Sequence, residues 1–149
     1  MRAFFNAARI LLFAIIAVVV PHGAVSADAP APFVVIVHPN NPHHTLDRAF
    51  VADAFLKKTT RWPGGEVIKP VDLPTDSSAR ERFSQDVLKR SVSAVKSYWQ
   101  QIIFSGRDVP PPELSSDEVV VQYVLTHNGA IGYVSGTAHL GNARPVVVR

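Results

Sequence analysis

Residues Phe33–Val37 form an uninterrupted apolar run, and four of the five are β-branched. A run this short, without alternating polar residues, is typical of a β-strand that is buried on both faces. The segment Pro39–Pro42 follows it closely, and its prolines and asparagines predict a turn. Strands of this kind belong to sheets that helices cover on both sides, so the run favours an α/β protein.

Helical and strand-like patterns alternate along the rest of the chain. Apolar residues recur at three- and four-residue steps after Thr45, which predicts a helix that is capped by Thr45 and ends near Lys58. Pro70 lies in a short apolar run and indicates a strand near a sheet edge. The same criteria predict helices at 78–90, at 91–104 and from 115 onward, and strands at 67–71, 130–134 and 145–148.

This alternation predicts the fold class. Strands that are separated by helices require some parallel pairing through crossover connections. We therefore expect an α/β fold, a single three-layer domain with a central mixed, largely parallel sheet flanked by helices.

The first 27 residues have the pattern of a signal peptide. Arg2 and Arg9 make the start basic, the run Ile10–Val20 is apolar, and small residues precede a cleavage site after Ala27. The apolar run is shorter than the roughly 20 residues that a membrane-spanning helix needs, so an uncleaved anchor is the weaker alternative. We expect residues 28–149 to form one periplasmic or secreted domain, with no stable membrane span after cleavage.

Charge and cysteine content exclude several classes of function. The chain has 15 Lys+Arg and 12 Asp+Glu, and loss of two arginines with the leader would leave 13 against 12. Such a balanced charge gives no electrostatic basis for nucleic-acid binding. Cysteine is absent, so the chain has no disulfide, no thiol nucleophile and no thiolate metal site.

The segment TDSSARERF, residues 75–83, carries the clearest chemical signal. A helix that begins near Ser77 or Ser78 leaves its first backbone N–H groups unpaired, and such a helix start attracts anions. The competing interpretation is a helix cap alone, since Ser78 and Glu81 have the spacing of a capping box. The carboxylate of Asp76 would repel an anion unless it turns away or accepts the ligand's proton.

Other chemistry has weaker support. His38, His43 and His44 could contribute to a zinc or copper site, but no thiolate or carboxylate set completes it. A hydrolase is the third alternative, and it lacks sequence support because the motifs GxSxG and HExxH are both missing. We expect no catalysis and no cofactor.

Five stretches of the chain form a recognisable set: VHPNNP at 37–42, AFL at 54–56, WPGG at 62–65, SSARERF at 77–83 and GAIGYVS at 129–135. Together they resemble the phosphate-binding proteins of bacterial ABC transporters, a branch of the type 2 periplasmic binding protein superfamily, in order and in spacing. The resemblance covers roughly residues 33 to 136.

This resemblance implies a site and a fold. In the family two α/β lobes close over the anion, and one lobe contributes a Ser-Gly-Thr-Arg-like turn at a helix start. The turn corresponds to Ser77, Ser78, Ala79 and Arg80, which we take as the candidate ligand-binding residues. Ala79 lacks the family's hydroxyl, and the stretch Val71–Pro74 lacks the arginine that the family places there.

The chain has about half the length that two lobes need. It resembles a single lobe, so a protein partner or a homodimer would have to complete the cleft. The resemblance implies an exported, non-catalytic domain that binds phosphate or a similar small oxyanion. The alternative is a protein-interaction or sensory module that kept the fold and lost the anion site.

Overall fold

A computed structural model describes residues 32–149, and these residues contain a five-stranded sheet with helices on both faces. The expected signal peptide and its cleavage site lie outside the described residues. Within 32–149 no helix is long and apolar enough to cross a membrane.

The predicted first strand, β1 (Phe33–Val37), lies at the centre of the sheet. It pairs antiparallel with β4 (Ala130–Ser135) on one side and with β5 (Arg144–Val148) on the other. Two short outer strands, β2 (Thr45–Leu46) and β3 (Lys69–Pro70), pair parallel with β5 and β4. The sheet is mixed, as predicted, but it is not largely parallel. Only the pairings of the short edge strands β2 and β3 are parallel, because β1 pairs antiparallel with two strands from the C-terminal part of the chain.

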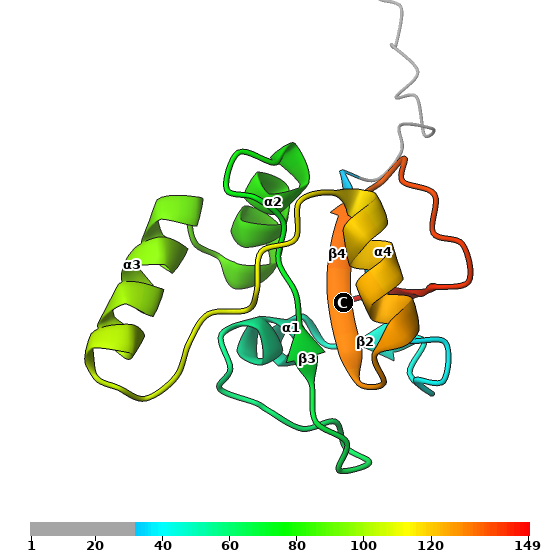
Figure 1. Cartoon of the computed structure of the whole chain (residues 1–149), viewed down its shortest axis with the longest axis horizontal. Coiled ribbons are helices and arrows are strands. Elements are labelled where there is room, and N and C mark those ends of the chain that lie inside the picture. The colour runs from blue at the N-terminus through cyan, green and yellow to red at the C-terminus, as the bar shows by residue number, and fades with distance from the viewer. Residues whose placement is uncertain (1–31) are drawn as a thin grey trace, which may run out of the picture.

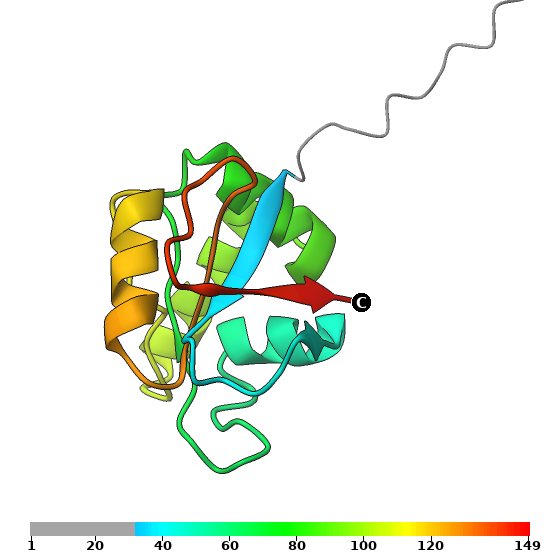
Figure 2. The ribbon, with the colours of Figure 1, turned by 90° about the vertical axis from the view of Figure 1, so that its right-hand side faces the viewer.

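The two faces of the sheet carry different helices. On β4, a Cβ added at Gly132 would lie 2.7 Å from a methyl group of Val120, so this face packs against α4 (Asp117–Thr126). The next residue, Tyr133, points to the other face and stacks on Phe83 of α2 (Ser78–Phe83). Helix α1 (Arg48–Phe55) covers that same face through Phe55 (Figure 2). The predicted three-layer α/β domain is therefore confirmed.

The predicted helix cap at Thr45 is wrong. Thr45 and Leu46 form β2, where they pair with the end of β5, and α1 begins only after Asp47. The β-branched Thr45 is suited to an edge strand, and the Arg48 N–H bonds the carbonyl of Arg149 instead of a side-chain cap. Helix α1 then ends at Phe55, ahead of Lys57 in a left-handed conformation.

The helix predicted at 78–90 consists of two parts. Helix α2 continues without a break into a π-helical turn, η1 (Ser84–Leu88), and the left-handed Lys89 ends it. The following helix, α3 (Val92–Phe104), is capped by Ser91, as α4 is by Ser116. Figure 1 shows α3 farthest from the sheet, beyond α2. Only Val95 and Trp99 of α3 are buried, so this helix is held by few side chains.

Candidate functional site

The loop that follows β3 leads directly into the start of α2. Ser77 has extended backbone angles, and its hydroxyl accepts the N–H of Arg80 at 3.3 Å. Its own N–H donates to the carbonyl of Pro74. Ser77 is thus the N-cap of α2, one residue ahead of the Ser78–Glu81 capping box that the sequence indicated.

Two donors remain at this helix start. Within the described residues, the N–H groups of Ser78 and Ala79 have no protein acceptor, as expected for the first turn of a helix. Ser78 is exposed, whereas the Ala79 side chain is buried. The first turn therefore presents backbone N–H groups and one exposed hydroxyl.

A shallow hollow of about 300 Å³ lies beside this helix start. Ser77 shares it with hydroxyl groups of the loop and of the start of α3, including Ser91 and Ser93. The carboxylates of Asp76 and Glu81 also line it. Ser78 and Ala79 do not line this hollow, so an anion inside it would meet hydroxyl groups and two negative charges, and the helix N–H groups lie at its side.

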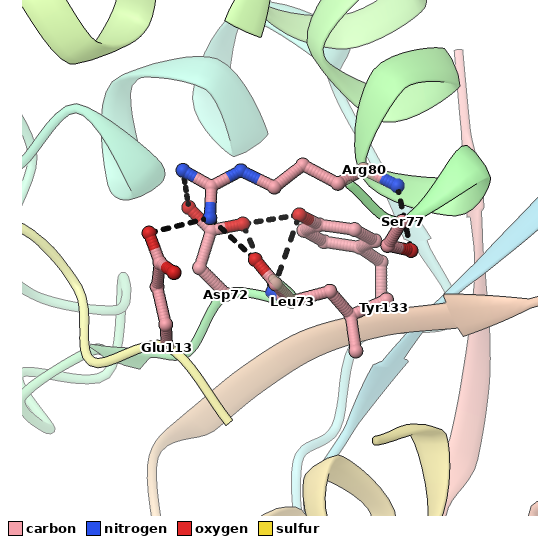
Figure 3. A network of polar contacts seen from close by, with 6 residues as sticks. All are labelled: Asp72, Leu73, Ser77, Arg80, Glu113 and Tyr133. Carbon is pink, nitrogen blue, oxygen red and sulfur yellow. Dashed lines mark hydrogen bonds and ion pairs between the residues drawn. The ribbon is translucent and has the colours of Figure 1, made fainter. Parts of the chain in front are cut away.

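The guanidinium group of Arg80 lies away from the helix start. Figure 3 shows the side chain running from the Ser77 end of α2 toward the loop residues Asp72 and Leu73. Its Nη2 lies 3.2 Å from a carboxylate oxygen of Asp72, and its Nη1 donates to the Leu73 carbonyl and lies 3.0 Å from Glu113. Arg80 is only 5% exposed, and the carboxylates of Asp72 and Glu113 neutralise its charge.

Asp72 joins this ion pair to the sheet. One of its oxygens accepts the hydroxyl of Tyr133 and the N–H of Leu73. Burial raises the pKa of Asp72, although Arg80 and the Tyr133 hydroxyl act in the opposite direction. Burial and the neighbouring Asp72 carboxylate raise the pKa of Tyr133. The network fixes the loop before α2 against β4.

Sequence reasoning missed this network. Asp72 directly follows the strand predicted at 67–71, and Tyr133 is a polar side chain inside the apolar strand β4. A buried tyrosine hydroxyl needs a partner, and an acidic residue at a strand end is a suitable one. Glu113 carried no such signal, because it lies in a proline-rich loop far along the chain.

The histidines do not form a metal site in the described residues, where no cluster of three or more ligating side chains occurs. His38 accepts the N–H of Asn40 through its ring nitrogen, which belongs to a local turn. The ring of His43 stacks on Trp62 with centroids 5.7 Å apart. The contacts of His38 and His43 stabilise the loop that contains them.

No protein-family model and no curated protein sequence matches the chain. Solved structures are similar to it in fold. One, described as a phosphate ABC transporter substrate-binding protein with bound phosphate, from Clostridium perfringens, has a TM-score of 0.59 at 20% sequence identity. An ABC-type phosphate transport receptor from Vibrio cholerae has a TM-score of 0.60 at 16% identity, and PstS from Borrelia burgdorferi 0.59 at 9%.

These structures match most of the chain but only part of their own length. The match covers 78% of this chain and 44% of the Clostridium protein, 78% and 46% for the Vibrio protein, and 79% and 47% for the Borrelia protein. The chain therefore spans less than half of each phosphate-binding protein that it resembles. What the resemblance shows is the fold: residues 32–149 form an α/β domain similar to part of the phosphate-binding proteins of ABC transporters.

Proposed function

We propose that the chain is an exported, non-catalytic domain of the periplasm that binds phosphate or a similar small oxyanion at the start of α2. The observation that carries this proposal is the pair of N–H groups on Ser78 and Ala79, which have no acceptor within residues 32–149, in a fold similar to that of phosphate-binding proteins. Helix starts bind oxyanions through such groups and through the helix dipole.

The four candidate residues then have different roles. Ser77 stabilises the first turn of α2 by capping it. The exposed Ser78 adds a hydroxyl group to the two backbone N–H donors. Ala79 contributes its backbone alone. Arg80 is a positioning residue, because its guanidinium holds the loop ahead of Ser77 through the carbonyl of Leu73.

Asp76 gives the site a preference among anions. Its carboxylate lies beside the helix start and repels an anion with no proton to donate. A hydrogenphosphate can donate its proton to that carboxylate, whereas sulfate carries no proton at neutral pH. We therefore expect phosphate to bind more tightly than sulfate.

A second candidate is a protein-interaction module that no longer binds an anion. It is favoured by the engagement of Arg80 with Asp72 and Glu113, which directs this cation away from the start of α2. Exposed apolar residues near the end of α3, above all Phe104, offer a surface for a protein partner or a second copy that would complete the cleft.

Amide NMR with added phosphate distinguishes the two candidates. Oxyanion binding predicts shifts of the Ser78 and Ala79 amide signals, and the variant Ser77→Ala should weaken them by disordering the first turn. Ser116→Ala is the matched control, because Ser116 caps α4 in the same way. The site would be refuted if phosphate shifted amide signals all over the surface, or if Ser77→Ala and Ser116→Ala changed the Ser78 and Ala79 shifts equally.

A further inference from the structure

A second hollow, of about 400 Å³, lies between α3 and the proline-rich loop before α4. Its volume falls within the range of small-molecule sites. It shares Thr75 with the hollow at the start of α2, but the rest of its lining is different. The side chains that matter for its chemistry are Arg80, Lys96, Trp99, Ile103 and Glu113.

Two cations border this hollow. Arg80 is held on its inner side by the buried Asp72, while its contact with Glu113 involves a carboxylate side chain that is 50% exposed. Lys96 is exposed and pairs with no carboxylate in residues 32–149. Among the described residues, Glu113 is therefore the one carboxylate that balances this positive charge on the outer side, and water weakens its contact with Arg80.

The remaining lining is apolar. Trp99 is almost fully buried and forms one wall, and Ile103, one turn further along α3, is 48% exposed. A cationic edge next to an apolar wall fits a ligand that has one negative group and an apolar part. A fully hydrated inorganic anion gains nothing from the apolar wall.

We infer that this hollow binds a small organic carboxylate with an apolar group, and that Glu113 occupies the ligand's place on Arg80 when the hollow is empty. The ligand carboxylate accepts hydrogen bonds from the Arg80 guanidinium and the Lys96 ammonium group, and Glu113 turns into solvent. The apolar group lies against Trp99 and Ile103. The ligand of this hollow belongs to a different chemical class from the oxyanion proposed for the start of α2, and its binding does not depend on that oxyanion.

The test uses N-acetylleucine and its amide, which differ only in the charged group. The two indole N–H signals in an NMR titration report the position, since Trp62 donates its indole N–H to Gly129 in a different part of the fold. We expect N-acetylleucine to shift the Trp99 signal and leave the Trp62 signal unchanged. The amide should bind at least about tenfold more weakly, because charge-assisted hydrogen bonds are lost.

Two exposed positions test the roles without disturbing the core. Glu113→Gln should tighten binding of N-acetylleucine by about two- to fivefold and Lys96→Gln should weaken it by a similar factor, as expected for partly exposed charges. Lys69→Gln, which removes an exposed lysine on β3, should leave the affinity unchanged. An unshifted Trp99 signal, equal affinity for acid and amide, or a Glu113→Gln variant with no gain would each overturn the inference.

Discussion

Arg80 is the residue whose position most shapes the site. Its place in the sequence, directly after SSA, indicated a ligand contact, yet its guanidinium group lies inside the protein between Asp72 and Glu113. A buried ion pair contributes little net stability, but removal of one partner leaves the other charge unpaired in a poorly hydrated position. Arg80 therefore matters for the fold whether or not an anion binds.

Replacement of Arg80 by methionine should lower the free energy of unfolding by about 3–5 kcal/mol, because Asp72 would remain buried without its cation. Arg82→Met is the control, since the Arg82 side chain is 53% exposed and its one ion pair within residues 32–149 is with Asp86, one turn away. That variant should change stability by no more than about 0.5 kcal/mol. Urea denaturation measures both, and equal losses would show that the buried network is not the stabilising feature.

Tyr133 provides a pH-dependent signal from the same network. Its raised pKa keeps the phenol protonated in the folded protein above the pH, about 10, at which a free tyrosine ionises. A raised folded pKa means that the associated stability is fully present below about pH 10 and is lost as the pH rises further. Of the three tyrosines, Tyr133 should ionise only with unfolding.

Ultraviolet difference absorbance during an alkaline titration, followed together with circular dichroism, checks this behaviour. The late phenolate signal should coincide with loss of secondary structure, and it should be missing from Tyr133→Phe. Ionisation of Tyr133 while the circular dichroism is still that of the folded protein would contradict its assigned environment.

At the scale of elements, the contact of β4 with α4 depends on a residue without a side chain. A Cβ at Gly132 would meet Val120 at 2.7 Å and Val71 at 3.1 Å, and both valines are fully buried. Gly132 thus permits α4 to approach the sheet closely, inside the GAIGYVS stretch on which the family resemblance depends most.

Gly132→Ala should therefore cost about 1–3 kcal/mol of stability through overpacking. Gly64→Ala is the control, since nothing lies within 4 Å of its added Cβ. Combining Gly132→Ala with Val120→Ala should cost less than the sum of the single changes, because the second removes the methyl group in conflict. Additive losses in thermal or urea unfolding would mean that α4 does not pack on β4 at this point.

Strands and helix starts with a local sequence signal could be predicted. Continuous apolar runs identified β1, β4 and β5. Ser91 and the serines near 116 identified the starts of α3 and α4. The prediction that Thr45 caps a helix was wrong, because pairing with β5, from the other end of the chain, determines the conformation of Thr45. The direction of the strands also depends on such long-range pairing, which no local pattern encodes.

The candidate site was predictable to a smaller extent. The helix start at Ser77 has a local signature, and the structure places the cap there. The inward position of Arg80 depends on Asp72, Glu113 and Tyr133, which come from three separate segments. Only the folded chain brings these groups together.

At the scale of the whole molecule, the chain spans less than half of the phosphate-binding proteins that it resembles. A site on one such domain has one face open to water, where hydrogen bonds to an anion compete with solvent. The affinity we expect is therefore modest, and a partner or second copy that covers the helix start would raise it.

Calorimetric titration of the chain from Asp28 onward with phosphate, and in parallel with sulfate, tests the central claim most directly. We predict one phosphate per chain with a dissociation constant below about 1 mM, equivalent to about −4 kcal/mol, and weaker binding of sulfate because of Asp76. Absence of phosphate binding in this range, with the domain folded, would contradict the oxyanion-binding proposal and favour the protein-interaction module.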